Sequence, residues 1–396
     1  MSSVSSSSRA RAVDLRARSC EILGDLVAFP TVSSDSNQAL IAYAAGVLED
    51  CGAKVDLSTS ACGGKANLFA TLGPEVDGGI LLSGHSDVVP VTDQDWSSDP
   101  FVMEQREGRL YGRGTCDMKG FIAASLAMAP VYAAQVGARP MHFAFTYDEE
   151  IGCFGAQHLA ADLKSRGLTP GVAIIGEPTE MRVIEGHKGC YEYSTHFHGL
   201  EGHGSAPDLG VNAVEYAVRY VSELLQLKQR LRDMAPPQGR FEPPWTTINV
   251  GALQGGVAHN VIASKAQVDW EMRPVSLRDA EFVKTALRQL CADELLPLMR
   301  QTHPEASITL ETIGEVAGLE PMAENQAREI MLELTGANGA DLVAFGTEAG
   351  IFQALGMDVV VCGPGSINQA HKADEYLALD QLDQCLTVLQ RLGRHL

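Results

Sequence analysis

The sequence lacks long apolar runs and is poor in aromatic and basic residues. Without 18 consecutive apolar residues, no segment is predicted to span a membrane. Aromatic residues make up 6% of the 396 residues, and 30 Lys and Arg stand against 50 Asp and Glu. The resulting formal charge of −20 disfavours a nucleic-acid partner, because such partners select basic surfaces. Hydrophobic residues at 45% and charged residues at 20% are typical of a soluble globular protein.

Cysteine is present but unpatterned, which excludes two structural uses of the residue. The 9 cysteines are odd in number, scattered, and never spaced C-x-x-C. A disulfide framework or a cysteine-type zinc site is therefore not predicted, and a reducing, cytoplasmic compartment is favoured.

The first residues, MSSVSSSSRARAVDLRARS, are rich in Ser and Arg and nearly free of acids. That composition is also found in transit peptides, but the segment lacks the apolar core of a secretory signal. The pattern favours a tail that runs into a helix. Its apolar stripe would be Leu15, Ile22, Leu23, Leu26 and Val27.

The order of predicted elements indicates two kinds of fold in one chain. Between about residues 40 and 178, strands alternate with helices, which predicts an α/β domain with a mostly parallel sheet. From about residue 188 the order becomes β-α-β-β-α-β, as in a ferredoxin-like sandwich. The α/β pattern resumes near residue 318. We therefore predict a catalytic domain of residues 1–187 and 315–396, with residues 188–314 inserted.

Polar side chains collect at the ends of the predicted strands, where open α/β sheets bind ligands. They are His85 and Asp87 after ILLSG, Asp117 in GRGTCDMKG, Glu149 and Glu150 after FAFTY, Glu177 after VAIIG, and His371 after VVVC. Taken singly, each has an ordinary structural explanation, such as a helix cap for Asp117. Five such positions at five strand ends are improbable by chance. Two His with three of these five carboxylates would already exceed the needs of one catalytic zinc, but they fit two ions that share a carboxylate.

Other catalytic signatures are missing. The sequence has no G-x-S-x-G, no H-E-x-x-H, no G-x-x-x-x-G-K-[ST] and no G-x-G-x-x-G after the first strands. These absences disfavour a serine hydrolase of that type, a P-loop enzyme and a dinucleotide-binding enzyme.

Five motifs in order resemble those of the di-zinc aminoacylase and carboxypeptidase G-like metallohydrolases. They are HSDVVP, GTCDMKG, YDEEIG, GEPT and GPGSINQAHKADEY. The resemblance covers nearly the whole chain. It implies a zinc-peptidase-like catalytic domain, an inserted ferredoxin-like lid used for homodimerisation, and a cis peptide after Asp117. It also implies two divalent metal ions, Zn²⁺ in the first place, with Co²⁺ able to substitute.

The resemblance also implies residue roles. His85 and Glu177 would hold one ion, Glu150 and His371 the other, and Asp117 would bridge them. Asp87 would accept a hydrogen bond from the far nitrogen of His85. Glu149 would be the general base that activates the attacking water, and His203 on the lid would stabilise the oxyanion in the other subunit of a dimer. Asp148 has no ligand role in this scheme and is predicted to point outward or to cap.

The resemblance further implies an N-acyl amino acid as substrate. Arg273 and Asn260 on the lid would hold its carboxylate, with Lys188 as a further contact and Gly365 and Ser366 as donors from the catalytic domain. Glu348 stands where relatives have Asp or Ser, and we predict that it faces a distal substrate ammonium. A deacylase, a desuccinylase and a dipeptidase share this mechanism. A non-catalytic binding protein on the same fold is the alternative from another class, although the ligands and base are all present.

Overall fold

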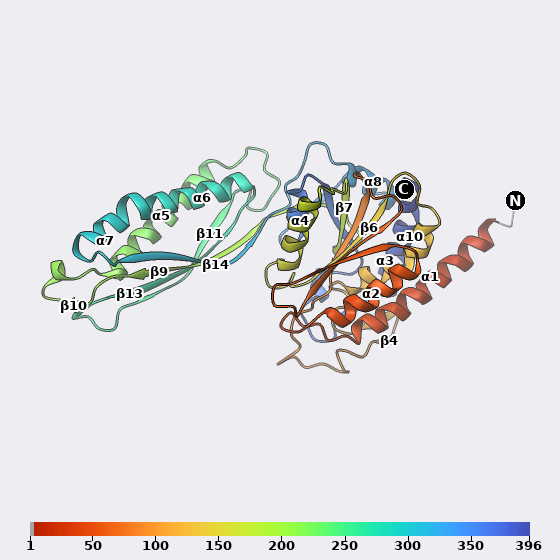
Figure 1. The fold of residues 1–396 in the computed structure, drawn as a ribbon, viewed down its shortest axis with the longest axis horizontal. Coiled ribbons are helices and arrows are strands. Elements are labelled where there is room, and N and C mark those ends of the chain that lie inside the picture. Colours follow the sequence, from red (N-terminus) through yellow and green to blue (C-terminus); the bar gives the residue numbers. More distant parts are fainter. Residues whose placement is uncertain (1–3) are drawn as a thin grey trace. The chain divides into compact units, whose positions relative to one another are not determined.

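The computed structural model describes residues 4–396, with side chains described from Leu15 onward. The chain forms two compact units (Figure 1). Unit 1 comprises the described residues up to Gly186 together with Pro321–Asp341 and Thr347–Leu396. Unit 2 comprises His187–Glu320 and Leu342–Gly346, so the chain leaves unit 1 and later returns to it.

Unit 1 is built on an eight-stranded sheet with the order β1-β2-β6-β3-β7-β16-β8-β15. Its central strands β6, β3, β7 and β16 are parallel, whereas β1, β2 and β8 pair antiparallel. The strands are β1 (Lys54–Thr59), β2 (Ala66–Leu72), β3 (Ile80–His85), β6 (Met141–Thr146), β7 (Val172–Pro178), β8 (Ile184–His187), β15 (Asp341–Val343) and β16 (Asp358–Gly363). The predicted α/β fold with a mostly parallel sheet is confirmed.

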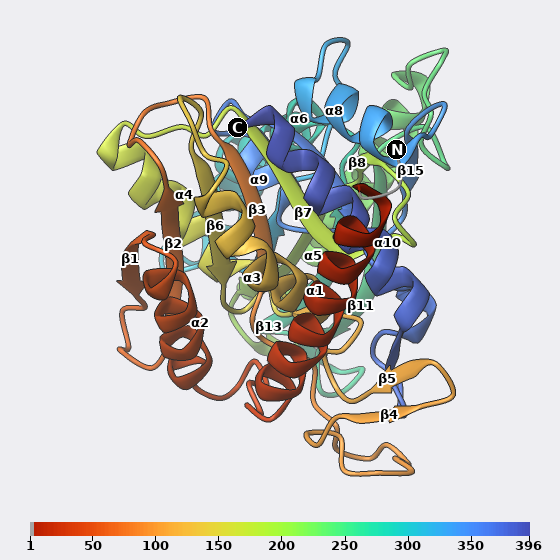
Figure 2. The ribbon, with the colours of Figure 1, turned by 90° about the vertical axis from the view of Figure 1, so that its right-hand side faces the viewer.

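Helices cover this sheet because its central strands are mostly apolar and are buried along their whole length, so both faces of the sheet must be covered. The helices are α1 (Val4–Val27), α2 (Gln38–Asp50), α3 (Lys119–Ala133), α4 (Phe154–Arg166), α8 (Gln326–Thr335), α9 (Ala349–Gln353) and α10 (Leu379–Leu392). Figure 2 shows α1, α2, α3 and α10 together over the sheet. The five predicted apolar residues of α1 are all buried there.

A three-stranded sheet extends unit 1 beside the end of the chain. It consists of β4 (Glu104–Arg106), β5 (Arg109–Tyr111) and β17 (Tyr376–Ala378), in the order β17-β5-β4. Short 3₁₀ turns lie at Pro207–Leu209, Ile367–Gln369 and Gly393–His395. The pairing of β5 with β17 brings the segments around residues 111 and 376 together.

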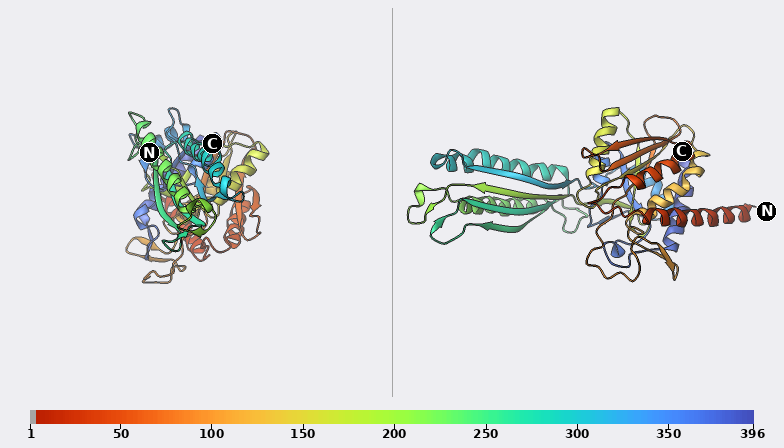
Figure 3. Two further views of the ribbon diagram at one scale, coloured as in Figure 1. Left: turned by 90° about the vertical axis from the view of Figure 1, so that its left-hand side faces the viewer. Right: turned by 60° about the horizontal axis from the view of Figure 1, so that its bottom comes forward.

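Unit 2 contains a four-stranded antiparallel sheet with helices on one face (Figure 3). In the order β11-β13-β9-β14, its strands are Thr247–Gly255, Lys265–Arg273, Cys190–His198 and Ser307–Val316. The helices are α5 (Ala213–Asp233) and α6 (Leu277–Gln289), and α6 continues through a π-helical segment, Leu290–Leu295, into α7 (Leu296–Thr302). A small ladder pairs β10 (Gly202–His203) with β12 (Val261–Ile262). The chain order and strand order confirm the predicted ferredoxin-like arrangement.

No helix among residues 4–396 is both long enough and apolar enough to cross a membrane.

Candidate metal centre

The five predicted metal ligands all belong to unit 1 and come from the same edge of its sheet. His85 is the last residue of β3, and Glu177 lies near the end of β7. Glu150 follows β6, His371 follows β16, and Asp117 lies in the loop before α3. Because β3, β6, β7 and β16 are parallel, their carboxyl ends meet at one edge of the sheet, and this topology brings the side chains together.

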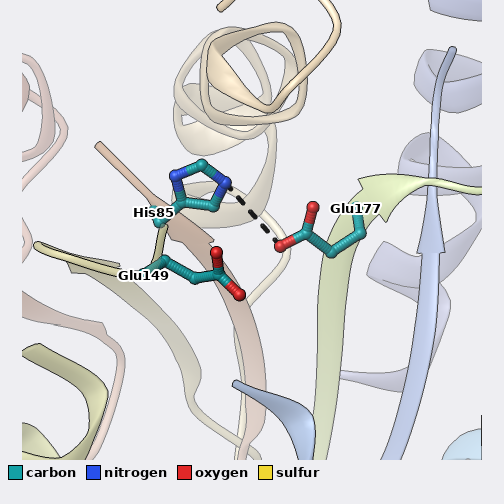
Figure 4. Close-up of side chains that lie close together, drawn as sticks. All are labelled: His85, Glu149 and Glu177. Carbon is teal, nitrogen blue, oxygen red and sulfur yellow. Dashed lines mark ion pairs between the residues drawn. The ribbon is translucent and has the colours of Figure 1, made fainter. Parts of the chain in front are cut away.

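Asp117 lies between the two histidines. Its Oδ1 is 3.0 Å from His85 Nε2, and its Oδ2 is 3.3 Å from His371 Nε2. Each histidine also has a second carboxylate nearby. Glu177 Oε1 lies 3.8 Å from His85 Nε2 (Figure 4), and Glu150 Oε2 lies 3.0 Å from His371 Nε2. One carboxylate therefore has an oxygen directed at each of two His–Glu pairs, which suits a bridge between two cations.

The residues present fit bound metal ions. Glu177 Oε1 is buried and has no hydrogen-bond partner among the described residues, so it is directed at a place where a cation would satisfy it. Two sets of three side chains have ligand atoms within 4.8 Å of one another: His85, Glu149 and Glu177, and His85, Asp117 and Glu150. Imidazole nitrogen with carboxylate oxygen is a donor set that suits zinc and related divalent ions. Glu149 also lies among the ligand atoms, so its position alone does not separate a base from a ligand (Figure 4).

The protonation equilibria of the metal-free site reflect crowded buried carboxylates. Burial, together with repulsion from Glu150 and Asp117, raises the pKa of Glu149 to about 8 against an attraction from His85. Burial and repulsion from Asp117 likewise raise the pKa of Glu177 well above its usual range. Hydrogen bonds to Asp117 and Glu150 raise the pKa of His371 to about 10. Without metal, bound protons therefore reduce the negative charge of the crowded carboxylates, as bound dications would in the metal-loaded site.

Asp87 makes more contacts at the site than the predicted hydrogen bond with His85. The Nδ1 of His85 lies 2.9 Å from the backbone carbonyl oxygen of Asp87 and 3.5 Å from the carboxylate Oδ1. The Asp87 carboxylate accepts hydrogen bonds from the backbone N–H groups of Glu149 at 3.1 Å and Glu150 at 3.4 Å. Ser33 Oγ donates to the same carboxylate at 2.7 Å. Asp87 thus fixes both the ring of His85 and the turn that carries the two glutamates.

Asp148 does not point outward, which is one of the two roles predicted for it. It is 8% exposed, its φ is 56°, and its carboxylate forms an ion pair with Lys65 Nζ, which also donates to the carbonyl of Ser33. The sequence does not reveal this contact, because Lys65 belongs to no recognisable motif and lies 83 residues from Asp148 in the chain. Cys153 is a further residue at the site that the sequence did not predict. Its thiol lies 3.5 Å from Glu149 Oε1.

The carboxylate of Glu348, which was predicted to face a substrate ammonium, has two partners within the protein. Its side chain is fully buried, and its carboxylate accepts hydrogen bonds from Ser83 Oγ at 2.5 Å and Thr146 Oγ1 at 2.7 Å. Ser83 lies on β3 and Thr146 ends β6, so Glu348 joins the two strands that lead to His85 and Glu149. The sequence could not show this because Ser83 and Glu348 are 265 residues apart.

Gly365 and Ser366 lie in the loop after β16, next to the loop that carries Asp117. The thiol of Cys116 donates to the Ser366 carbonyl at 3.4 Å. Gly365 has a φ of 90°, and a Cβ there would lie 2.6 Å from Cys116 Sγ, so the close approach of the two loops requires glycine. The predicted cis peptide between Asp117 and Met118 is present.

The predicted lid residues form two separate groups within unit 2. His203 and Asn260 are exposed at the β10–β12 ladder, where Gly204 N donates to the Asn260 carbonyl at 2.8 Å. Arg273 and Lys188 line a cavity of about 390 Å³ at the other end of the sheet. The strand β13 separates the groups, with Lys265 at the His203 end and Arg273 at its last position. Nine extended residues span roughly 25–30 Å, which is the approximate separation of the groups.

The fold and this donor set define a metallohydrolase. The sequence profile of the peptidase family M20/M25/M40 matches residues 81–395, and the chain belongs to this family.

Individual relatives match the chain over nearly its whole length. The chain is 34% identical over 364 residues to the acetylornithine deacetylase of Shigella sonnei (strain Ss046), covering 90% of this chain and 92% of that protein. A tripeptidase from Staphylococcus aureus has a similar structure, with a TM-score of 0.66 at 20% identity, over 96% of this chain and 99% of that one. A dinuclear metal-binding M20 peptidase from Bacillus subtilis gives a TM-score of 0.61 at 14% identity, over 95% and 98%.

Proposed function

We propose that the protein is a dinuclear metal-dependent amide hydrolase that converts N2-acetyl-L-ornithine to L-ornithine and acetate, a step of arginine biosynthesis. The observation that carries the proposal is the Asp117 carboxylate, which directs one oxygen at His85 and the other at His371. The specific substrate is supported by the 34% identity to an acetylornithine deacetylase over 90% of the chain.

The chain's own residues would divide the work as follows. His85 and Glu177 would hold one divalent ion, Glu150 and His371 the second, and Asp117 both. When bound, such ions acidify water and polarise an acyl oxygen, and Zn²⁺ or Co²⁺ suits these donors. Glu149 would take the proton of the attacking water and return it to the leaving amine. Asp87 would keep Glu149 in place through the hydrogen bond from the Glu149 backbone N–H.

A homodimer would explain how both groups of predicted lid residues could contact a substrate although they lie far apart in one chain. His203 and Arg273 lie at opposite ends of β13, and an N-acyl amino acid is far shorter than the roughly 25–30 Å between them. One chain therefore cannot bring both side chains to one substrate through unit 2 alone. We propose that Arg273 acts within its own chain and that His203, with Asn260 beside it, serves the site of a second copy.

The cavity in unit 2 supports recognition of a carboxylate. It is lined by Lys188, Arg240 and Arg273, which place three cationic side chains around about 390 Å³, and one carboxylate, that of Glu242, lines it as well. Arg273 donates to Glu271 through Nε at 3.0 Å and one Nη at 2.7 Å. Lys188 Nζ donates to the carbonyls of Pro243 at 2.6 Å and Trp245 at 2.9 Å. A guanidinium that is already oriented binds a carboxylate with little loss of side-chain entropy.

A substrate panel tests the proposal. We expect the zinc-loaded protein to hydrolyse acetylornithine with a higher kcat/KM than acetylcitrulline, acetylmethionine, formylmethionine, succinyl-diaminopimelate or a dipeptide. Preference for acetylmethionine would replace the named substrate while keeping the metal-dependent mechanism. Preference for succinyl-diaminopimelate or the dipeptide would assign the protein to another activity of its family. Metal binding without hydrolysis of any of these amides would favour a binding protein.

Glu348→Gln tests the role of the buried carboxylate. Because Ser83 and Thr146 occupy it, we expect a loss of kcat of roughly tenfold through misplacement of the strand ends, equal for acetylornithine and acetylcitrulline. The two substrates differ in whether the distal group is a cation, so their comparison isolates a charge contact. A rise in KM confined to acetylornithine would restore the predicted ammonium contact.

A further inference from the structure

Glu375 is a buried carboxylate that no predicted role includes. It is 1% exposed and lies four positions after His371, at the start of the segment that becomes β17. Its Oε1 accepts hydrogen bonds from the backbone N–H groups of Cys116 at 2.8 Å and Asp117 at 3.0 Å. Its Oε2 accepts from the backbone N–H of Gly114 at 3.0 Å. One side chain thus satisfies three N–H groups of the loop that presents Asp117.

Arg113 completes the cluster and extends it to His371. Its guanidinium is also 1% exposed, and Nη1 donates to Glu375 Oε2 at 2.7 Å. The same nitrogen lies 3.3 Å from the carbonyl oxygen of Lys372, and Nη2 donates to Gln94 Oε1 at 2.5 Å. Gln94 Nε2 in turn donates to the carbonyl of His371 at 3.0 Å. The network therefore connects the backbone of the loop that carries Asp117 to the backbone at His371 and Lys372.

The energetics suggest a role other than stability alone. Desolvating an ion pair opposes folding, and well-packed apolar residues of similar volume are often as stabilising as a buried pair. A hydrogen-bonded polar network instead rigidifies what it connects. In this network one buried atom, Arg113 Nε, has no hydrogen-bond partner among the described residues. Asp117 and His371 are 254 positions apart in the sequence, so their mutual placement must be set by contacts such as these.

We propose that Glu375 is a positioning residue that sets Asp117 relative to His371 and thereby the affinity of the dinuclear site for metal. The inference rests on the proposed metal-binding roles of Asp117 and His371, but it is independent of which amide is hydrolysed. Glu375 does this by accepting the N–H groups of residues 114, 116 and 117, while Arg113 keeps its carboxylate in the required orientation.

Glu375→Gln tests the proposal by metal binding. An amide keeps the shape but directs an NH₂ group at donors, so we expect affinity for Zn²⁺, measured by competition with a chromophoric chelator, to fall about 10- to 100-fold. At saturating zinc, kcat should fall while KM for acetylornithine stays near that of the unmodified protein. Asp374→Asn is the matched control. Its exposed carboxylate contacts Ser97 instead, so removing that charge one residue away should leave zinc affinity unchanged.

The double variant Arg113→Met/Glu375→Gln separates positioning from simple charge neutralisation. If Glu375 only neutralised Arg113, removing both charges would restore zinc affinity. Because the Gln amide has one accepting oxygen in place of two, at least one of the three backbone N–H groups would still lack its acceptor, and we expect affinity to stay low. Glu375→Asp, which keeps the charge, provides a variant in case the amide prevents folding, and it should show intermediate affinity. Recovery in the double variant, or unchanged zinc affinity in both single Glu375 variants, would overturn the proposal. Failure to hydrolyse acetylornithine would not, because chelator competition needs no substrate.

Discussion

Replacement of Glu149 by Gln should lower kcat for amide hydrolysis by about 10²- to 10⁴-fold, the contribution of a positioned general base. Gln has the same shape but takes no proton from water. Because the Asp87 carboxylate holds the backbone N–H of residue 149, the turn should keep its conformation in the variant. The change should therefore appear in kcat, whereas KM and the folded structure stay close to those of the unmodified protein.

Metal content decides whether Glu149 is a base or a ligand. Its oxygen lies among those of His85 and Glu177, so the geometry allows either role. We expect Glu149→Gln to retain two ions per chain by elemental analysis. The comparison is Glu150→Gln, which removes the carboxylate 3.0 Å from His371 Nε2 and should bind about one ion. Loss of metal from Glu149→Gln, or full activity in it, would contradict the assignment as base.

Removal of metal should abolish hydrolysis and lower the Tm by about 5–10 °C, with both restored by Zn²⁺ or Co²⁺. Ions at 100 times their Kd stabilise a folded protein by about 2.7 kcal/mol, and each kcal/mol shifts the Tm of a domain of this size by about 2–4 °C. The physical source is the repulsion among buried carboxylates, together with a Glu177 oxygen that has no hydrogen-bond partner in the described part of the chain. Dialysis against a chelator followed by calorimetry measures the shift. An unchanged Tm after complete chelation would contradict a metal centre at these residues.

The Tm of the chelated protein should also fall as pH rises from 6 to 9. The folded-state pKa of Glu149 is raised from 4.5 to about 8, and that of His371 from 6.5 to about 10. In this range the folded protein therefore holds protons that the unfolded chain has released, so stability is lost with rising pH. Ligands bind metal in their deprotonated forms, so metal affinity rises with pH. The difference in Tm between loaded and chelated protein should widen towards pH 9, and a constant difference would count against this account.

The sequence by itself determined the class of the protein. Alternation of apolar strands with helices predicted the α/β sheet, and the β-α-β-β-α-β order predicted the ferredoxin-like arrangement; both are present. The candidate ligands could be named because parallel strands end at one edge, so a His or an acid directly after a strand is placed there by topology alone. These are local signals, since each needs only a few neighbouring residues.

Only the tertiary structure decided which polar groups surround those ligands. Glu348 with Ser83, Lys65 with Asp148, and Glu375 with the loop of Asp117 meet across 265, 83 and 258 positions of the chain. Such contacts have no period and no motif, because they arise where buried polar groups find partners after the sheet has formed. The separation of His203 from Arg273 is likewise set by the length of β13. The sequence therefore predicted the chemistry of the site, and the packing of distant segments fixed its geometry.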